Sequence, residues 1–162
     1  MQSILIRFNT PIGFLTLESN NNQICKIEKD SEETKIYQQK PEDQNIINAK
    51  NQIIEFLTGI RQDFNLQFDI PGSDLFYKIY EIVMQIPYGS TISYGSVAKK
   101  AGIIQGGRVV GNVLAQNPLP LLIPCHRVIR SDGSIGNYSL GGSICKNYLL
   151  TLEANRVSKE KK

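Results

Sequence analysis

Alternating apolar and polar positions dominate the first third of the chain. Apolar residues fall at every second position from Ile4 to Phe8, and the alternation continues through 12–18 (IGFLTLE) and 23–28 (QICKIE). A period of two places successive side chains on opposite faces of a strand. The polar segment SNNN between the last two runs is typical of a turn. We therefore predict three strands, followed by a polar surface loop at 30–45.

A helix and a further strand are expected to complete this first part. The spacing of apolar residues in 47–59 (INAKNQIIEFLTG) predicts a helix that ends at Gly59. Alternation in 63–70 (DFNLQFDI) predicts another strand. The segment PGS then breaks the pattern, so we place a domain boundary between residues 72 and 73. The expected inward faces are Ala49, Ile53, Ile54 and Leu57 in the helix, and Phe64, Leu66, Phe68 and Ile70 in the strand.

The second part of the chain is mostly helical in its pattern. Ser73 is placed to cap a helix that runs to PYG at 87–89. A short helix follows at 93–102, and a third helix at 106–118 is stopped by its terminal Asn-Pro pair. The expected buried stripes are Leu75, Phe76, Ile79, Ile82, Val83 and Ile86 in the first helix, Val97, Ala98 and Ala101 in the second, and Val109, Val110, Val113 and Leu114 in the third.

The last two of these helices are joined by a tight, glycine-containing turn, which is typical of a helix-turn-helix. Such helix pairs also occur in purely structural roles, so the pattern alone leaves DNA binding open. The third helix opens with Gly106, Gly107 and Arg108. Glycines bring backbone N–H groups close to a ligand, and a helix N-terminus attracts phosphate. The alternative is a flexible turn with an exposed arginine.

Charge changes sign along the chain. Residues 1–72 carry 7 Lys and Arg against 10 Asp and Glu, whereas residues 73–162 carry 11 against 5, so a net of −3 is followed by +6. A basic second half suits binding to a polyanion, with a solvated basic surface as the alternative.

Composition and cysteine usage narrow the class of protein. With 162 residues, 41% of them hydrophobic, the chain fits one or two globular domains, and no apolar run approaches the roughly 20 residues of a membrane span. The start turns polar by its ninth residue, so we expect no signal peptide. Three scattered cysteines favour a reducing compartment, and one histidine is too few for a structural zinc site. We expect Cys25 and Cys145 to be packing residues.

The only histidine, His126, directly follows Cys125 inside an apolar run behind Pro124. Proline favours an extended form before it, so we expect 119–123 (LPLLI) to be strand-like and to meet a sharp turn at the cysteine. A nucleophilic cysteine needs a base, and imidazole titrates near neutrality. Adjacent side chains point apart, so we expect a relay through one water. Arg127 either adds positive potential or pairs with a carboxylate, and a buried cysteine acting as a small hydrophobe is the structural alternative.

The segment NPLPLLIPCHRVI (117–129) resembles the active-site signature of the O6-alkylguanine-DNA alkyltransferases, also called methylated-DNA–protein-cysteine methyltransferases. The resemblance extends upstream through IPYGSTISYGSVAKKAG (86–102) and GGRVVGNVLAQNP (106–118). Downstream it continues through GSIGNYSLGGSICKNYLLTLE (133–153), so that it covers residues 73–153.

This resemblance implies an α+β chain of two domains. Residues 1–72 would form a small ribonuclease H-like domain of sheet plus helix, which matches only in the order of its elements. Residues 73–162 would form a mostly helical, winged-helix-like domain with the helix-turn-helix. In this family the helix-turn-helix works in the minor groove.

The resemblance also implies DNA repair by direct, irreversible and stoichiometric alkyl transfer. The alkyl group, methyl above all, would pass from O6 of guanine, or O4 of thymine, in double-stranded DNA to the Cys125 thiolate after base flipping. Displacement at a saturated carbon needs a soft thiolate, and charge that develops on O6 can be offset by a phenolic proton. Flipping costs a few kcal/mol. No cofactor, metal or membrane is implied, and we expect a cytoplasmic monomer, nuclear in a eukaryote.

Individual roles follow from the same resemblance. His126 would deprotonate Cys125 through water, Glu153 would fix the tautomer of His126, and Asn117 would support the turn. Tyr94 would rotate the 3′ phosphate and donate a proton towards O6. The remaining roles are entry of Arg108 into the DNA stack, approach of the Gly106 and Gly107 backbone to DNA, and binding of guanine by Val128, Tyr138 and Ser139.

The chain departs from the family pattern in two places. Gly107 stands where the family usually has proline or alanine, which would loosen the helix start. The segment from Tyr138 to Lys146 is one residue longer than the commoner spacing, which leaves open whether Gly141 or Gly142 lines the pocket. Two other classes compete with a transferase. They are a DNA-binding alkyltransferase-like protein, which lacks the acceptor cysteine, and a cysteine hydrolase, which would turn over repeatedly.

Overall fold

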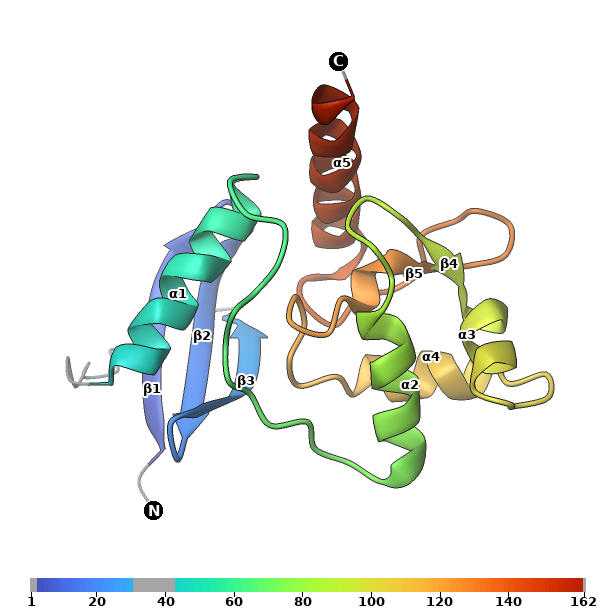
Figure 1. The fold of residues 1–162 in the computed structure, drawn as a ribbon, viewed down its shortest axis with the longest axis horizontal. Helices are drawn as coiled ribbons and strands as arrows, with labels where there is room; N and C mark the ends of the chain where they lie inside the picture. Colours follow the sequence, from blue (N-terminus) through green and yellow to red (C-terminus); the bar gives the residue numbers. More distant parts are fainter. Residues whose placement is uncertain (1–2, 31–42, 162) are drawn as a thin grey trace. The chain divides into compact units, whose positions relative to one another are not determined.

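The chain folds into two compact units, Met1–Ile70 and Pro71–Lys162, in a computed structural model that describes residues 3–30 and 43–161 (Figure 1). The expected domain boundary between residues 72 and 73 lies beside this division. Most of the loop expected at 30–45 lies outside the described residues. Within the described part of the chain, no helix is both long enough and apolar enough to cross a membrane.

The first unit contains the three predicted strands, which form an antiparallel meander in the order β1-β2-β3. In the register of the sheet, Leu17 lies opposite Ile6 on one side and Ile27 on the other. All three side chains are buried, which confirms the face predicted from the alternation. The strands are β1 (Ile4–Thr10), β2 (Gly13–Asn20) and β3 (Gln23–Lys29).

Helix α1 (Gln44–Leu57) packs along this sheet (Figure 1). Asp43 caps it by accepting hydrogen bonds from the backbone N–H groups of the first turn, at 2.9 Å and 3.3 Å. Gly59 follows the helix with φ of +76°, as expected of a residue that ends it. Ile54 is only half-buried, and Phe56 takes its place in the buried face.

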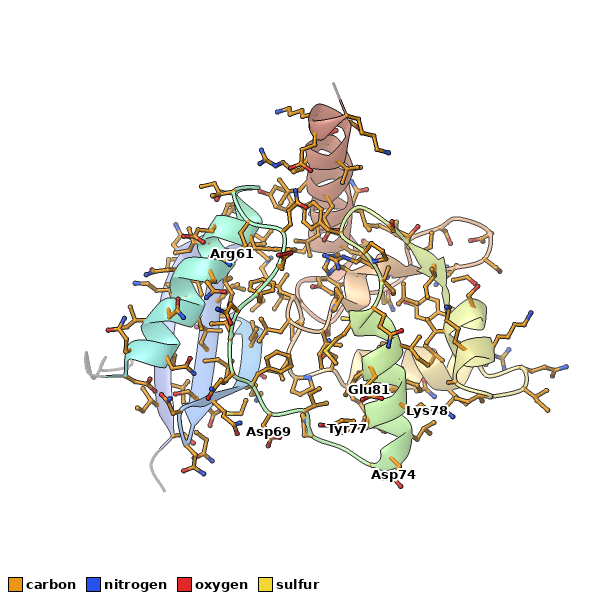
Figure 2. The ribbon with its side chains drawn as sticks, viewed as in Figure 1. Arg61, Asp69, Asp74, Tyr77, Lys78 and Glu81 are labelled. Carbon is orange, nitrogen blue, oxygen red and sulfur yellow. The ribbon has the colours of Figure 1, made fainter. Side chains whose placement is uncertain are left out.

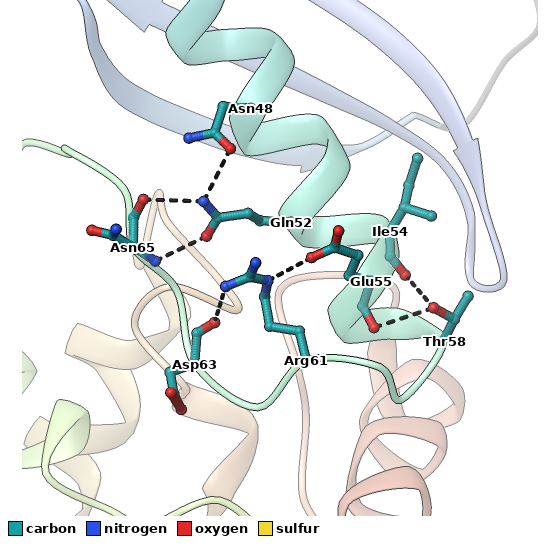
Figure 3. Close-up of polar contacts among 8 residues, drawn as sticks. All are labelled: Asn48, Gln52, Ile54, Glu55, Thr58, Arg61, Asp63 and Asn65. Atoms are coloured by element: carbon teal, nitrogen blue, oxygen red, sulfur yellow. Dashed lines mark hydrogen bonds and ion pairs between the residues drawn. The ribbon is translucent and has the colours of Figure 1, made fainter.

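The strand predicted at 63–70 is wrong. The segment forms only an isolated bridge, between Phe68 and Ile24. The bridge has two backbone hydrogen bonds, from Ile24 to the Gln67 carbonyl at 3.0 Å and from Asp69 to the Ile24 carbonyl at 3.2 Å. At Asn65 the partner is a side chain: Gln52 donates to the carbonyl at 3.1 Å and accepts from the N–H at 2.9 Å (Figure 3). These side-chain bonds take the place of a strand ladder at Asn65.

The second unit is mostly helical, so the whole chain is α+β as expected. A two-stranded parallel sheet joins the start of α3 to the residues after the Cys-His-Arg turn. The elements are α2 (Asp74–Met84), β4 (Ile92–Ser93), α3 (Tyr94–Lys100), α4 (Gly107–Ala115), the 3-10 turn η1 (Cys125–Arg127), β5 (Val128–Ile129) and α5 (Gly142–Glu160).

Helix α2 buries a narrower stripe than its sequence predicts. Ser73 stands at the cap position, but its side chain makes no capping hydrogen bond. Leu75 is 39% exposed, whereas Tyr80, which the apolar pattern missed, is fully buried and donates to the Val113 carbonyl at 3.3 Å. The exposed face carries Asp74, Tyr77, Lys78 and Glu81 (Figure 2).

Helices α3 and α4 form the predicted pair, with one correction. Val109 was expected inside but is 38% exposed, because the buried stripe of α4 runs through Val110, Val113 and Leu114. Gly106 is required by packing: a Cβ there would stand 2.2 Å from the side chain of Ile103. The space beside Gly107 accepts a Cβ at ordinary distances.

The run 119–123 is not the strand-like segment that we predicted. Leu121 adopts φ of +78°, and the run closes into a tight, buried loop. Asn117 holds this loop from inside. Its side-chain oxygen accepts from the N–H of Leu119 at 3.0 Å, and its amide donates to the carbonyl of Ile123 at 3.0 Å. These bonds satisfy a buried backbone without a sheet.

The segment between Tyr138 and Lys146, which we expect to be one residue longer than is common, turns just before α5. Leu140 is buried, and Gly141 and Gly142 follow with φ of +89° and +68°. Two successive left-handed residues favour glycine. The N–H of Gly142 donates to the Tyr138 carbonyl at 3.0 Å and closes the turn.

Candidate active site

A pocket of about 850 Å³ opens between α3, α4, the turn at Cys125 and the loop that follows β5. It brings six of the predicted residues together on its wall: Tyr94, Gly107, Arg108, Cys125, Tyr138 and Ser139. Four others are buried outside its lining: Asn117, His126, Val128 and Glu153. Gly106 borders a smaller neighbouring hollow, and neither Gly141 nor Gly142 is among the described residues that line the larger one.

Cys125 begins the 3-10 turn that follows Pro124 and is only 4% exposed. Its Sγ lies 3.2 Å from the donating amide of Asn117. Burial raises the pKa of the Cys125 thiol. The hydrogen bond from Asn117 and the charge of Lys146 act against that rise, with a further hydrogen bond from Ser139. The thiol is therefore protonated at neutral pH in the free protein, and its reaction needs a proton acceptor.

His126 is fully buried behind this thiol, and its Nε2 lies 2.6 Å from Oε1 of Glu153. Burial lowers the pKa of His126 and outweighs the hydrogen bond and charge of Glu153, so the ring is neutral at pH 7. A carboxylate can only accept, so Nε2 carries the proton and Nδ1 the basic lone pair. This tautomer suits the expected relay from Cys125.

Glu153 is the hub of a buried polar network. Arg127 donates to its carboxylate through Nε, at 3.0 Å to Oε2, and through one terminal nitrogen, at 3.1 Å to Oε1. The N–H of Gly89 donates to Oε2 at 2.8 Å. Burial opposes ionisation of Glu153, but the hydrogen bonds of His126 and Arg127 and the charge of Arg127 prevail and hold its pKa below the ordinary value.

The sequence left two roles open for Arg127, added positive potential or an ion pair with a carboxylate. The structure shows the ion pair, with Glu153. The guanidinium also donates to the Ile86 carbonyl at 2.8 Å. Because it neutralises Glu153, Arg127 keeps the hydrogen-bond acceptor of His126 ionised. The same contacts tie α5 to the turn that carries the thiol.

Tyr94 stands at the start of α3 and faces the pocket. Burial and the neighbouring Cys125 raise its pKa, and the charge of Arg130 acts in the opposite direction. The hydroxyl is therefore protonated at neutral pH and available as a donor. Gly136 lies beside this hydroxyl, and its φ of +71° is the conformation that favours glycine there.

Lys146 is the main site residue that sequence reasoning missed. It is fully buried, and its Nζ donates to the Val128 carbonyl at 2.7 Å, to the Asn137 carbonyl at 3.4 Å and to the Tyr94 hydroxyl at 3.4 Å. Three donors thus meet three acceptors. Burial lowers the pKa of Lys146 to about 8, against the opposing effect of Cys125. One sequence signal was present: Lys146 and Glu153 interrupt the buried stripe of α5.

Tyr138 lines the pocket and also contacts the imidazole. Its ring meets that of His126 edge to face, with 6.1 Å between centroids. Its hydroxyl is buried and has no hydrogen-bond partner among the described residues. Burial raises its pKa well above the ordinary value, so this group donates rather than ionises.

The site offers acid–base and nucleophilic groups rather than a metal centre. In the described ranges, no group of three or more His, Cys, Asp or Glu side chains is placed to hold a metal ion.

Comparisons with known proteins agree on one family. Residues 74–155 match the family model described as "6-O-methylguanine DNA methyltransferase, DNA binding domain". A methylated-DNA–protein-cysteine methyltransferase of Mycobacterium bovis is 31% identical over 92% of this chain and 91% of its own length. A constitutive enzyme of the same name from Bacillus subtilis is 30% identical over 94% and 95%.

The fold has a solved counterpart. The crystal structure of Mycobacterium tuberculosis OGT in complex with DNA superposes with a TM-score of 0.82 at 31% identity, over 94% of this chain and 93% of that one. Both units of the chain are included in a match of this extent.

Proposed function

Because the chain belongs to the 6-O-methylguanine DNA methyltransferase family, we propose that it repairs duplex DNA by moving an alkyl group from guanine O6 to its own Cys125. One observation carries the proposal. The buried Cys125 thiol lines a pocket together with Gly107 and Arg108 at the start of α4, and the next residue, His126, is hydrogen-bonded to Glu153. Lesion-binding alone would not need this proton-accepting pair.

The proton of the thiol leaves first. It passes through one water to Nδ1 of His126, whose Nε2–H remains bonded to Glu153. The imidazolium that forms is stabilised by the adjacent carboxylate, which Arg127 alone neutralises in the resting state. The hydrogen bond from Asn117 and the charge of Lys146 stabilise the thiolate.

Transfer is a displacement at the alkyl carbon. The Cys125 sulfur forms the new S–C bond, the C–O6 bond breaks, and its electron pair remains on guanine O6. The Tyr94 hydroxyl offsets this charge by donating its proton towards O6. The product is a thioether, which nothing in the site reverses, so each molecule reacts once.

The target base must leave the duplex to reach the pocket. Arg108 would enter the stack in its place, and the backbone at Gly106 and Gly107 would approach the DNA. Val128, Tyr138 and Ser139 would bind the extruded guanine, with Tyr138 beside the base. O4-alkylthymine would be a second substrate of the same pocket.

The remaining features of the proposal concern architecture and setting. The first unit would be ribonuclease H-like and the second winged-helix-like. The protein would act as a monomer, without cofactor, in the cytoplasm or, in a eukaryote, in the nucleus. The odd number and scattered positions of the three cysteines favour a reducing compartment.

Stoichiometry tests the proposal. Duplex DNA carrying O6-methylguanine is mixed with limiting protein, and the remaining lesion is counted by chromatography. We expect repair to stop at one lesion per protein molecule. Continued turnover would instead support a hydrolase, and binding without loss of the lesion would support a non-catalytic lesion-binding protein.

A further inference from the structure

Arg130 is a cation of the pocket that the transfer mechanism does not use. It lines the same cavity as Cys125 and Arg108, and its residue is exposed. Its backbone is fixed in a tight turn, because its N–H donates to the Ser134 carbonyl at 2.9 Å and its own carbonyl accepts from Gly133 at 3.0 Å. The side chain therefore extends from a backbone that two hydrogen bonds hold in place, and it lines the pocket.

The stem of Arg130 runs over Gly136 towards Tyr94. A Cβ on Gly136 would stand 3.6 Å from Nε of Arg130 and 3.5 Å from the hydroxyl of Tyr94. Gly136 therefore lies close to both polar groups, and all three residues line the same pocket.

Hydrogen bonds from Ser134 and, to a lesser degree, the charge of Arg130 lower the pKa of the nearby Asp132 carboxylate, which forms no ion pair with this guanidinium. In the part of the chain that the structure describes, no hydrogen bond or ion pair involves the Arg130 side chain. The nearby Asp132 is bonded to the N–H of Ser134 at 2.9 Å and to its hydroxyl at 2.7 Å. Burial and, to a lesser degree, the charge of Arg130 lower the pKa of Lys146, and the same charge opposes the rise in the pKa of Tyr94. The guanidinium therefore lies near these two side chains.

We propose that Arg130 binds a backbone phosphate of the extruded nucleotide and so holds the base in the pocket. This inference rests on the proposed function, since it needs a flipped nucleotide. The base would occupy the cavity above Cys125, and its flanking phosphates would remain at the entrance, where Arg130 offers unpaired donors beside Tyr94. Guanidinium is well suited to phosphate because two of its N–H groups can donate at once. Arg108 would enter the duplex, and Arg130 would hold the extruded nucleotide by its phosphate.

Neutral phosphate analogues test the contact. Duplexes are made with one uncharged methylphosphonate at either the 5′ or the 3′ phosphate of O6-methylguanine. Single-turnover transfer is then measured for the wild type, for Arg130→Gln and for Lys78→Gln. Lys78 is the matched control, because it is an exposed cation of the same unit on the outer face of α2 (Figure 2).

We expect one neutral linkage to slow the wild type roughly ten-fold, the size of a hydrogen bond to a charged group. Arg130→Gln should slow transfer from natural DNA similarly and should lose all sensitivity to that linkage. Lys78→Gln should behave as the wild type. Reaction with free O6-methylguanine base should be equal in all three proteins, which also shows that the variants are folded.

Two results would overturn the inference. If the rate reduction caused by Arg130→Gln and that caused by each neutral linkage multiply when the two changes are combined, the effects are independent. Arg130 would then contact neither phosphate. If Arg130→Gln slows the free base as much as DNA, the residue acts inside the pocket and not on the backbone. A wild type that repairs no DNA would instead remove the proposed function itself.

Discussion

Nε2 of His126 and Oε1 of Glu153 lie 2.6 Å apart, and both side chains are excluded from solvent. The two residues come from different elements, the 3-10 turn and α5, so the contact is also a fixed joint between them. One carboxylate thereby sets the tautomer of the imidazole and holds the turn that presents the thiol.

Loss of the Glu153 charge should destabilise the fold. In Glu153→Gln the buried Arg127 loses its counter-ion, which costs about 3–5 kcal/mol when one partner of a buried pair is removed. Chemical denaturation measures the free energy of unfolding. Glu160→Gln is the matched control, since Glu160 pairs with Arg156 on the surface and its loss should cost no more than about 1 kcal/mol. Equal losses in the two variants would contradict the hub role.

The free energy of unfolding should decrease in mild acid because of His126. Its pKa is lowered by burial from 6.5, so the unfolded chain binds this proton more readily than the folded one. Stability should therefore decline as pH falls below 6.5, before the ordinary carboxylates titrate. His126 is the only histidine, so His126→Gln should flatten the curve of unfolding free energy between pH 6.5 and 4.5. An unchanged slope in that variant would be incompatible with a buried neutral ring.

Asn117 should control the ionisation of the nucleophile. Asn117→Asp replaces the amide that donates to Sγ with a carboxylate, which keeps the acceptor for Leu119 but repels a thiolate. The pKa of Cys125 should rise further, and transfer should slow roughly ten-fold or more. The pH dependence of Cys125 alkylation, followed by peptide mass, measures the shift. Asn155→Asp on the exposed side of α5 should change neither quantity.

Lys146 should impose an upper pH limit on transfer. Above about pH 8 it loses its proton, and with it one of its three N–H donors and the positive charge near the thiolate. We expect the wild-type rate constant to fall above this pH. Lys146→Arg, which stays charged, should remove the fall, and Lys146→Met should be slower at pH 7 with no fall. A wild-type rate that keeps rising past pH 9 would exclude this role.

Arg108 should matter only when a duplex must be opened. Arg108→Ala should impair transfer from duplex DNA far more than reaction with free O6-methylguanine base, because only the duplex needs a side chain to fill the vacated stack. Binding of the wild type to DNA should weaken as the salt concentration rises, because contacts with phosphate are screened by salt. Equal loss on both substrates would make Arg108 a structural residue.

Features local in sequence were predictable. The meander, α1 and the helix pair follow from periodicity, and the glycines that end helices follow from their backbone freedom. Features set by long-range contacts were not. The segment 63–70 has the alternation of a strand, but Gln52 takes the backbone bonds of Asn65. The tight loop at 119–123 depends on Asn117 filling its interior, which a proline-rich apolar run does not reveal.

The site residues also fall into two groups, those that the sequence identifies and those that only the fold brings together. Cys125 and His126 are adjacent in the chain, and a motif identifies them. Lys146 and Arg130 meet Tyr94 only through the fold, and a single lysine or arginine in a basic region carries no signal of burial or position. Their part in the site is recognised from the charges and contacts around them in the folded structure and not from the spacing of residues in the sequence.

The central claim is that Cys125 accepts the alkyl group. Intact-protein mass after mixing with duplex DNA carrying one O6-methylguanine tests it directly, with Cys125→Ser in parallel. We expect a gain of one methyl in place of hydrogen, saturating at one per molecule, located on Cys125 by peptide mass and absent from the variant. No gain despite tight binding to that DNA, or a methyl group found on Cys25 or Cys145, would contradict it.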